Sequence, residues 1–228
     1  MLSIKNGVNG YRKEKKHMNN QNEISFREQS TNLLLIFTRN PELGKVKTRL
    51  AKTIGDEAAL DIYKFLLEHT KQVTQNLSCD KAVYYSVKVR ENDIWNATTY
   101  QKHQQEGNDL GVRMLNAFQQ AFSTGYEKVV IIGSDLPDVT SEHINDAFEK
   151  LSSNDVVMGP AEDGGYYLLG MKKIHVNIFQ HKDWGTSTVR KDTLNDLQNE
   201  SVHLLGTLND VDVFDDIKNN PTFNQFLN

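Results

Sequence analysis

Basic side chains crowd into the segment F-T-R-N-P-E-L-G-K-V-K-T-R-L, which directly follows an apolar run at residues 33–36. A Walker-type phosphate loop needs G-x-x-x-x-G-K-[ST], in which glycines expose backbone N–H groups to the phosphate. Here Val46 follows Gly44-Lys45, and Arg39 occupies the place of the first glycine. We therefore expect a clamp of side chains that holds a diphosphate, built from Arg39, Gly44, Lys45, Lys47, Thr48 and Arg49.

A second chemical feature is Asp135, which follows the apolar run in the segment K-V-V-I-I-G-S-D-L-P-D-V. The run predicts a buried strand, and open α/β sheets bind ligands outside the carboxyl ends of their strands. Asp135 is therefore well placed to bind a divalent cation through its carboxylate oxygens. The alternative is that Asp135 caps a turn or the next helix, but Asp138 and Thr140 can fill that role.

Two more aspartates, Asp210 and Asp212, lie in L-N-D-V-D-V-F-D-D-I after the last apolar run. They can complete the metal site, since substrate phosphates and water fill much of the coordination shell of Mg²⁺ or Mn²⁺. Asp212 can equally cap a helix whose first turn carries Asp215 and Asp216, where negative charge is favourable. Both interpretations stay open for this segment.

The segment M-G-P-A-E-D-G-G-Y-Y-L-L-G combines two carboxylates with two adjacent glycines. Asp-Gly and Gly-Gly pairs are typical of tight hairpin turns. The same pattern lets a sugar or phosphate approach the backbone closely, because glycine has no side chain. We expect catalytic carboxylates at Asp163 and Glu162, and substrate contacts at Gly164 and Gly165.

Two further segments offer contacts to a substrate. In N-D-L-G-V-R-M, Asp109 and Arg113 are spaced i, i+4 and can pair on one helix face, a common surface feature worth about 0.2–0.5 kcal/mol. In D-W-G-T-S, Trp184 precedes a helix start, where it can staple the helix or form a stacking wall for a ligand ring. All three residues are therefore candidate substrate-binding residues.

The composition narrows the class of protein. A formal charge of −4 over 228 residues gives no overall basic field for nucleic acid. No apolar run reaches the ~20 residues of a membrane span, and the N-terminus lacks the apolar core of a signal peptide. The single cysteine, Cys79, excludes an internal disulfide and fits the cytoplasm. The histidines have no zinc-ligand spacing and no G-x-S-x-G occurs, which argues against zinc and serine hydrolases.

The periodicity of apolar residues predicts the domain organisation. Residues 1–31 are polar and lack a period, so we expect a flexible extension, followed by a single domain at residues 32–228. Short apolar runs alternate there with amphipathic stretches, which is typical of βαβ units and a largely parallel sheet. Strands are predicted at 33–38, 82–87, 128–133, 156–160, 166–171 and 202–205, and helices at 56–77, 109–122, 141–151 and 187–197.

Six motifs in order carry a family resemblance: R-N-P-E-L-G-K-V-K-T-R-L, N-D-L-G-V-R-M, G-S-D-L-P, G-P-A-E-D-G-G-Y-Y-L-L-G, W-G-T-S and D-V-D-V-F-D-D. Together they resemble a bacterial family of glycosyltransferase-like proteins in the GT-A superfamily of nucleotide-diphospho-sugar transferases. Some relatives are linked to arsenosugar biosynthesis. The resemblance extends from residue 33 to about residue 217, which is nearly the whole predicted domain.

The resemblance implies a Rossmann-like GT-A fold and an enzyme that transfers a glycosyl group from a nucleotide-sugar to a small acceptor. In that reading the loop at residues 39–49 holds the nucleotide's phosphates. Asp135 coordinates Mg²⁺ or Mn²⁺ together with Asp210 or Asp212, and Asp163 faces the second substrate.

Two other functions remain open. The ending K-T-R-L is similar to the K-S-R-L of phospholactate guanylyltransferases, in which an NTP and a phosphorylated acceptor give pyrophosphate. The same motifs therefore fit nucleotidyl transfer. A protein that kept the fold and binds nucleotides without catalysis is the third possibility, because fold alone does not determine activity.

Overall fold

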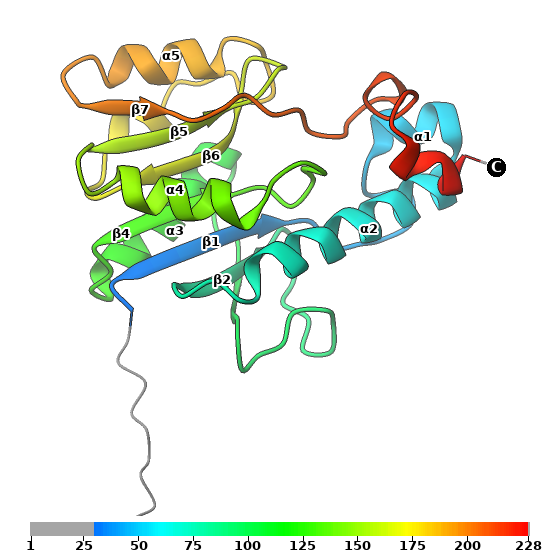
Figure 1. Cartoon of the computed structure of the whole chain (residues 1–228), viewed down its shortest axis with the longest axis horizontal. Helices are drawn as coiled ribbons and strands as arrows, with labels where there is room; N and C mark the ends of the chain where they lie inside the picture. Colours follow the sequence, from blue (N-terminus) through cyan, green and yellow to red (C-terminus); the bar gives the residue numbers. More distant parts are fainter. Residues whose placement is uncertain (1–29, 228) are drawn as a thin grey trace, which may run out of the picture.

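Seven strands form one sheet in the computed structural model, which describes residues 30–227 (Figure 1). The predicted N-terminal extension lies outside the described residues except for Ser30 and Thr31. Along the sheet the strands follow the order β3-β2-β1-β4-β6-β5-β7. Their bounds are Asn32–Thr38 (β1), Asp80–Tyr85 (β2), Gln101–Gln104 (β3), Lys128–Ile132 (β4), Val156–Pro160 (β5), Tyr166–Met171 (β6) and Val202–Leu204 (β7).

One strand of the sheet runs against the others. β6 pairs antiparallel with both β4 and β5, whereas the other neighbouring strands pair in parallel. A short turn at residues 161–165 joins β5 to β6, so this turn lies at the same edge of the sheet as the carboxyl ends of β1 and β4. The predicted α/β architecture with a mostly parallel central sheet is confirmed.

Helices cover both faces of this sheet (Figure 1). Leu34 and Ile36 of β1 share a core cluster with side chains of α2 and α4, while Leu33 and Leu35 face a second cluster formed with α3 and η1. No helix within residues 30–227 has the length and hydropathy of a membrane span. The helices are Thr48–Ile54 (α1), Asp56–Thr74 (α2), Leu110–Ser123 (α3), Ser141–Lys150 (α4) and Val189–Asp196 (α5), with 3₁₀ helices Val176–Phe179 (η1), Phe214–Asp216 (η2) and Pro221–Phe226 (η3).

One strand and one α-helix differ from the prediction. The edge strand β3 has the polar sequence Q-K-H-Q, so no apolar run marks it. A separate helix α1 precedes α2, and Gly55 divides the two with a φ of 86°, a conformation that glycine adopts without strain. The other predicted elements are present, with ends shifted by a few residues.

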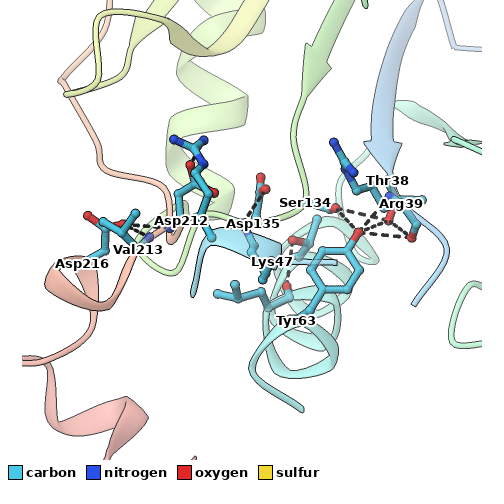
Figure 2. Close-up of polar contacts among 12 residues, drawn as sticks. Thr38, Arg39, Lys47, Tyr63, Ser134, Asp135, Asp212, Val213 and Asp216 are labelled. Atoms are coloured by element: carbon cyan, nitrogen blue, oxygen red, sulfur yellow. Dashed lines mark hydrogen bonds and ion pairs between the residues drawn. The ribbon is translucent and has the colours of Figure 1, made fainter. Parts of the chain in front are cut away.

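The hydroxyl group of Tyr63, on α2, links the ends of β1 and β4 (Figure 2). It accepts a hydrogen bond from the backbone N–H of Arg39 at 2.8 Å, and it lies 3.1 Å from Thr38 Oγ1 and 3.4 Å from Ser134 Oγ. Burial raises the pKa of Tyr63 above its ordinary value, so the hydroxyl group stays protonated. This buried cluster fixes the residue after Ser134, which is Asp135, relative to the loop that follows β1.

Tyr63→Phe should lower the free energy of unfolding by about 1–3 kcal/mol, because buried polar groups at the ends of two strands lose their shared partner. Tyr84→Phe is a matched control. The Tyr84 hydroxyl donates to the exposed Gln120 at 3.0 Å, so water can replace that bond, and we expect a loss below about 1 kcal/mol. Urea denaturation of both variants measures the difference. Equal losses of unfolding free energy in the two variants would mean that the Tyr63 hydroxyl group does not stabilise the fold more than the Tyr84 hydroxyl group does.

Candidate functional site

A cavity of about 230 Å³ opens at the carboxyl ends of β1 and β4. Phe37 and Ile132, at the ends of these two strands, form part of its wall. Three of the predicted carboxylates, Asp135, Asp163 and Asp210, also line it, although they lie in the loops after β4, β5 and β7. The fold thereby brings together acidic residues that are far apart in the sequence.

Lys47, in the loop after β1, bonds to Asp135 (Figure 2) but does not itself line the cavity. It directly precedes α1 and adopts a left-handed conformation, with φ of 47° and ψ of 41°, while its neighbour Val46 is buried. Lys47 Nζ donates to Asp135 Oδ2 at 2.7 Å, and only 6% of the lysine side chain is exposed. A predicted phosphate ligand and a predicted metal ligand are thus paired with each other.

The electrostatic setting of Asp210 indicates a surplus of negative charge. Burial is the main cause that raises the pKa of Asp210, and the charges of Asp135 and Asp163 raise it further, whereas Lys47 lowers it. A divalent cation would relieve this repulsion, and carboxylate oxygens are ligands that Mg²⁺ and Mn²⁺ prefer. Within residues 30–227, no group of three or more His, Cys, Asp or Glu side chains is arranged to hold a metal ion unaided. Asp135 and Asp210 offer carboxylate oxygens at the cavity, and the metal site that substrate phosphates would complete stays a prediction.

Arg49 and Asp212 form an ion pair, and neither lines the cavity. The backbone N–H of Asp212 donates to Asp216 Oδ2 at 2.8 Å (Figure 2). Asp216 therefore supports the start of η2, and the interpretation of Asp212 as the helix cap is wrong. The backbone N–H of Val211 donates to the carbonyl oxygen of Asp135 at 3.2 Å, which holds this segment against the loop after β4.

The other residues of the predicted clamp do not converge on Lys47. Arg39 is exposed and borders a separate hollow of about 70 Å³. Gly44 has a φ of 68° in the turn before α1, and Lys45 and Thr48 are exposed. The basic residues of the loop contact different parts of the chain, since Lys47 pairs with Asp135, Arg49 pairs with Asp212, and Arg39 borders the separate hollow. Their role in phosphate binding stays a prediction.

The turn between β5 and β6 has the predicted hairpin form. Asp163 Oδ1 accepts the N–H of Gly165 at 2.8 Å, and Gly164 has a φ of 91°. A Cβ atom at Gly164 would lie 2.4 Å from the carbonyl oxygen of Ser187, so the missing side chain serves close packing within the chain. Both Glu162 and Asp163 are exposed, but only Asp163 lines the cavity.

Asp109 and Arg113 do not form the predicted ion pair of side chains within the described chain. The Asp109 side chain accepts the backbone N–H of Val112 at 2.9 Å and so caps α3. Arg113 Nε donates instead to the carbonyl oxygen of Gly107 at 3.0 Å. Both residues organise the start of α3 and neither lines the cavity, so their contact with a substrate stays a prediction.

Trp184 lines the cavity together with apolar residues that the motifs did not identify. Gly111 lets α3 pack against this tryptophan, because a Cβ atom there would lie 2.7 Å from the indole ring. A usable signal is present in N-D-L-G-V-R-M, where Leu110 and Met114 are spaced i, i+4 and so share one face of α3. The unpredicted lining residues include Phe37, Leu110, Met114, Tyr166 and Val189.

Several known proteins are similar to this chain in sequence or in fold. Residues 69–186 match the family described as "Uncharacterized protein conserved in bacteria (DUF2064)". A solved structure from Desulfovibrio desulfuricans, described as a candidate nucleotide-diphospho-sugar transferase, is 34% identical to this chain with a TM-score of 0.74. That match covers 81% of this chain and 84% of the other.

Two matches are more distant. The 2-phospho-L-lactate guanylyltransferase of Methanocaldococcus vulcanius is 25% identical over 141 residues, so the match spans 61% of this chain and 61% of that curated relative. The 4-diphosphocytidyl-2C-methyl-D-erythritol synthase of Anaerococcus prevotii is 10% identical with a TM-score of 0.53, over 86% of this chain and 96% of the other. At that identity the likeness shows the fold alone.

The predicted likeness to nucleotide-diphospho-sugar transferases is confirmed, as is the expectation of an enzyme of the transferase class. The family match covers just over half of the 228 residues. The cavity, with its three aspartates at the edge of the sheet, is therefore the candidate active site of a chain that belongs to the bacterial DUF2064 family.

Proposed function

We propose that the protein transfers a glycosyl group from a nucleotide-sugar donor to a hydroxyl group of a small acceptor, with Mg²⁺ or Mn²⁺ as cofactor. The observation that carries this proposal is the bond between Lys47 and Asp135 at a cavity that Asp163 and Asp210 also line. A cation, metal-type ligands and a further carboxylate thus lie at the sheet edge where open α/β folds bind their ligands. The similarity to the candidate nucleotide-diphospho-sugar transferase over most of both chains supports the same function.

On the donor side, the diphosphate gains negative charge as its bond to the sugar breaks. Lys47 and Arg49 neutralise this charge, and prearranged positive charge of this kind lowers the barrier more than it strengthens substrate binding. Asp135 and Asp210 would hold the divalent cation, and the bound cation would supply additional positive charge to the phosphate oxygens. The bond to Asp135 keeps Lys47 at this edge until a phosphate competes for it.

On the acceptor side, Asp163 orients the acceptor hydroxyl group and accepts its proton. The acceptor oxygen forms a bond to the anomeric carbon of the sugar. The bond between that carbon and the diphosphate oxygen breaks, and the nucleoside diphosphate leaves with the bonding electrons. Asp163 lies in the cavity wall, which includes no Lys, Arg or His among the described residues, and this setting fits its role as a base.

Nucleotidyl transfer is the second candidate function, because the curated relative from Methanocaldococcus vulcanius is a guanylyltransferase. In that reaction an acceptor phosphate attacks the α-phosphate of an NTP, and pyrophosphate leaves. The ending K-T-R-L of the loop after β1 is also similar to the corresponding ending in phospholactate guanylyltransferases. Both reactions use a cationic loop and a metal ion.

The leaving group distinguishes the two reactions. Incubation with Mn²⁺, a panel of nucleotide-sugars and a panel of small alcohols should release a nucleoside diphosphate, detected by chromatography. Incubation with NTPs and phosphorylated acceptors should release no pyrophosphate. Pyrophosphate release would establish nucleotidyl transfer instead, and nucleotide binding without turnover in either panel would support a non-catalytic role.

Asp135→Asn should remove the metal dependence of nucleotide binding, because a neutral amide is a poorer ligand for a divalent cation. We expect the native protein to bind nucleoside diphosphates at least about tenfold more tightly with Mn²⁺ than with EDTA. The variant should show no such difference in calorimetric titrations.

Asp138→Asn is the matched control, since Asp138 lies in the same loop, is exposed and does not line the cavity. It should bind nucleotides as the native protein does. If Asp135→Asn keeps the full effect of Mn²⁺, then Asp135 is not the metal ligand.

A further inference from the structure

The wall of the cavity divides into two parts of different chemistry. Carboxylates lie on one side, at Asp135, Asp163 and Asp210. Much of the remaining wall is apolar, with Phe37, Leu110, Met114, Leu169, Trp184 and Val189. No Lys, Arg or His belongs to the wall in the described part of the chain.

We infer that this cavity binds the acceptor, and that the acceptor is an uncharged alcohol with an apolar, ring-sized body and without a phosphate or carboxylate group. This inference rests on the proposed function, because it assumes that the acceptor binds in the cavity and that the donor binds next to it. It goes further in naming the chemical class of that acceptor.

In the proposed function, Asp135, Asp210 and the donor diphosphate would balance the charge of the metal ion. Asp163 is then the wall carboxylate that faces the acceptor, and its negative charge argues against an anionic acceptor. A phosphate monoester carries about −1.5 to −2 at neutral pH, and like charges brought together across an interface cost several kcal/mol. Two basic side chains bond to residues of this wall without lining the cavity themselves, and the first, Lys47, donates to Asp135 Oδ2 at 2.7 Å. Arg190 bonds to the carbonyl oxygen of Ala161 and does not itself line the cavity. A hydroxyl group, in contrast, can donate a hydrogen bond to a carboxylate.

In the apolar part of the wall, the start of α3 packs closely against Trp184. Gly111 brings the start of α3 against the indole ring of Trp184, since any side chain there would collide with it. Leu110 stands next to this contact and is 43% exposed, although it lines the cavity. A bound apolar group would cover this leucine and remove its surface from water, which is favourable in proportion to the area buried.

The volume of the cavity sets the size of the ligand. An engineered cavity of about 150 Å³ lined by apolar side chains binds benzene. The cavity of about 230 Å³ therefore holds one ring with substituents, and it is too small to enclose a long lipid chain. Such a ligand places its ring against Trp184 and its hydroxyl group at the carboxylates.

Benzyl alcohol and benzyl phosphate form a matched pair of probes that differ by the charged group. In titrations of the full-length protein followed by ligand-observed NMR, benzyl alcohol should bind at least about tenfold more tightly than benzyl phosphate. Leu110→Ser should weaken benzyl alcohol binding by roughly tenfold, because part of the apolar wall is lost. Leu204→Ser is the control, since Leu204 is 47% exposed on β7 and lies outside the cavity wall.

Each outcome supports or overturns the inference. Equal or tighter binding of benzyl phosphate, no saturable binding of benzyl alcohol, or an equal effect of Leu110→Ser and Leu204→Ser would overturn it. Binding of nucleoside diphosphates with Mn²⁺ is measured in the same samples. Metal-dependent nucleotide binding without benzyl alcohol binding would reject the acceptor class and leave the proposed function standing. Benzyl alcohol binding without nucleotide binding would reject the proposed function instead.

Discussion

The ion pair between Lys47 and Asp135 joins the loop after β1 to the loop after β4, and the geometry of the site depends on it. Its lysine is almost fully buried while its aspartate is 36% exposed. Such a pair lies between exposed pairs, worth about 0–1 kcal/mol, and buried pairs, in which loss of one partner costs about 3–5 kcal/mol. The Tyr63 hydroxyl group and the backbone N–H of Val211 hold the same loop from two other directions. The backbone at Asp135 is therefore fixed, while its carboxylate stays accessible to a ligand.

Much of the fold follows from the sequence because most strands of the sheet are buried on both faces and appear as apolar runs. The run before Asp135 predicts both a central strand and an acidic residue at its carboxyl end, and both are found. The edge strand β3 consists of polar residues that are exposed or half-buried, so the hydropathy of the sequence does not predict it. The antiparallel direction of β6 follows from the turn at Gly164 and Gly165, which the Asp-Gly-Gly sequence indicated.

The candidate site could be predicted only in part, because spacing does not determine which partner a side chain finds. Asp109 caps α3 instead of pairing with Arg113. A helix cap is worth about 0.5–2 kcal/mol and an exposed i, i+4 ion pair about 0.2–0.5 kcal/mol, so the cap prevails. The basic residues after β1 are similarly separated, since Gly44 and Lys47 both adopt positive φ and turn the chain between them. The apolar wall depends on contacts between α3 and Trp184, which are distant in sequence.

Because β6 is antiparallel, the residues at the site come from two kinds of segment, namely loops that follow parallel strands and the hairpin turn between β5 and β6. The loop after β1 leads into α1, which packs on α2, and α2 packs against the sheet, so a change of its length would disturb the core. The turn between β5 and β6 instead closes a hairpin, and its Gly164 packs against Ser187 in the segment before α5. Asp163 lies on this turn, at the wall of the cavity. A change at this turn would therefore act first on the segment before α5, whereas a change in the loop after β1 would reach the core through α2.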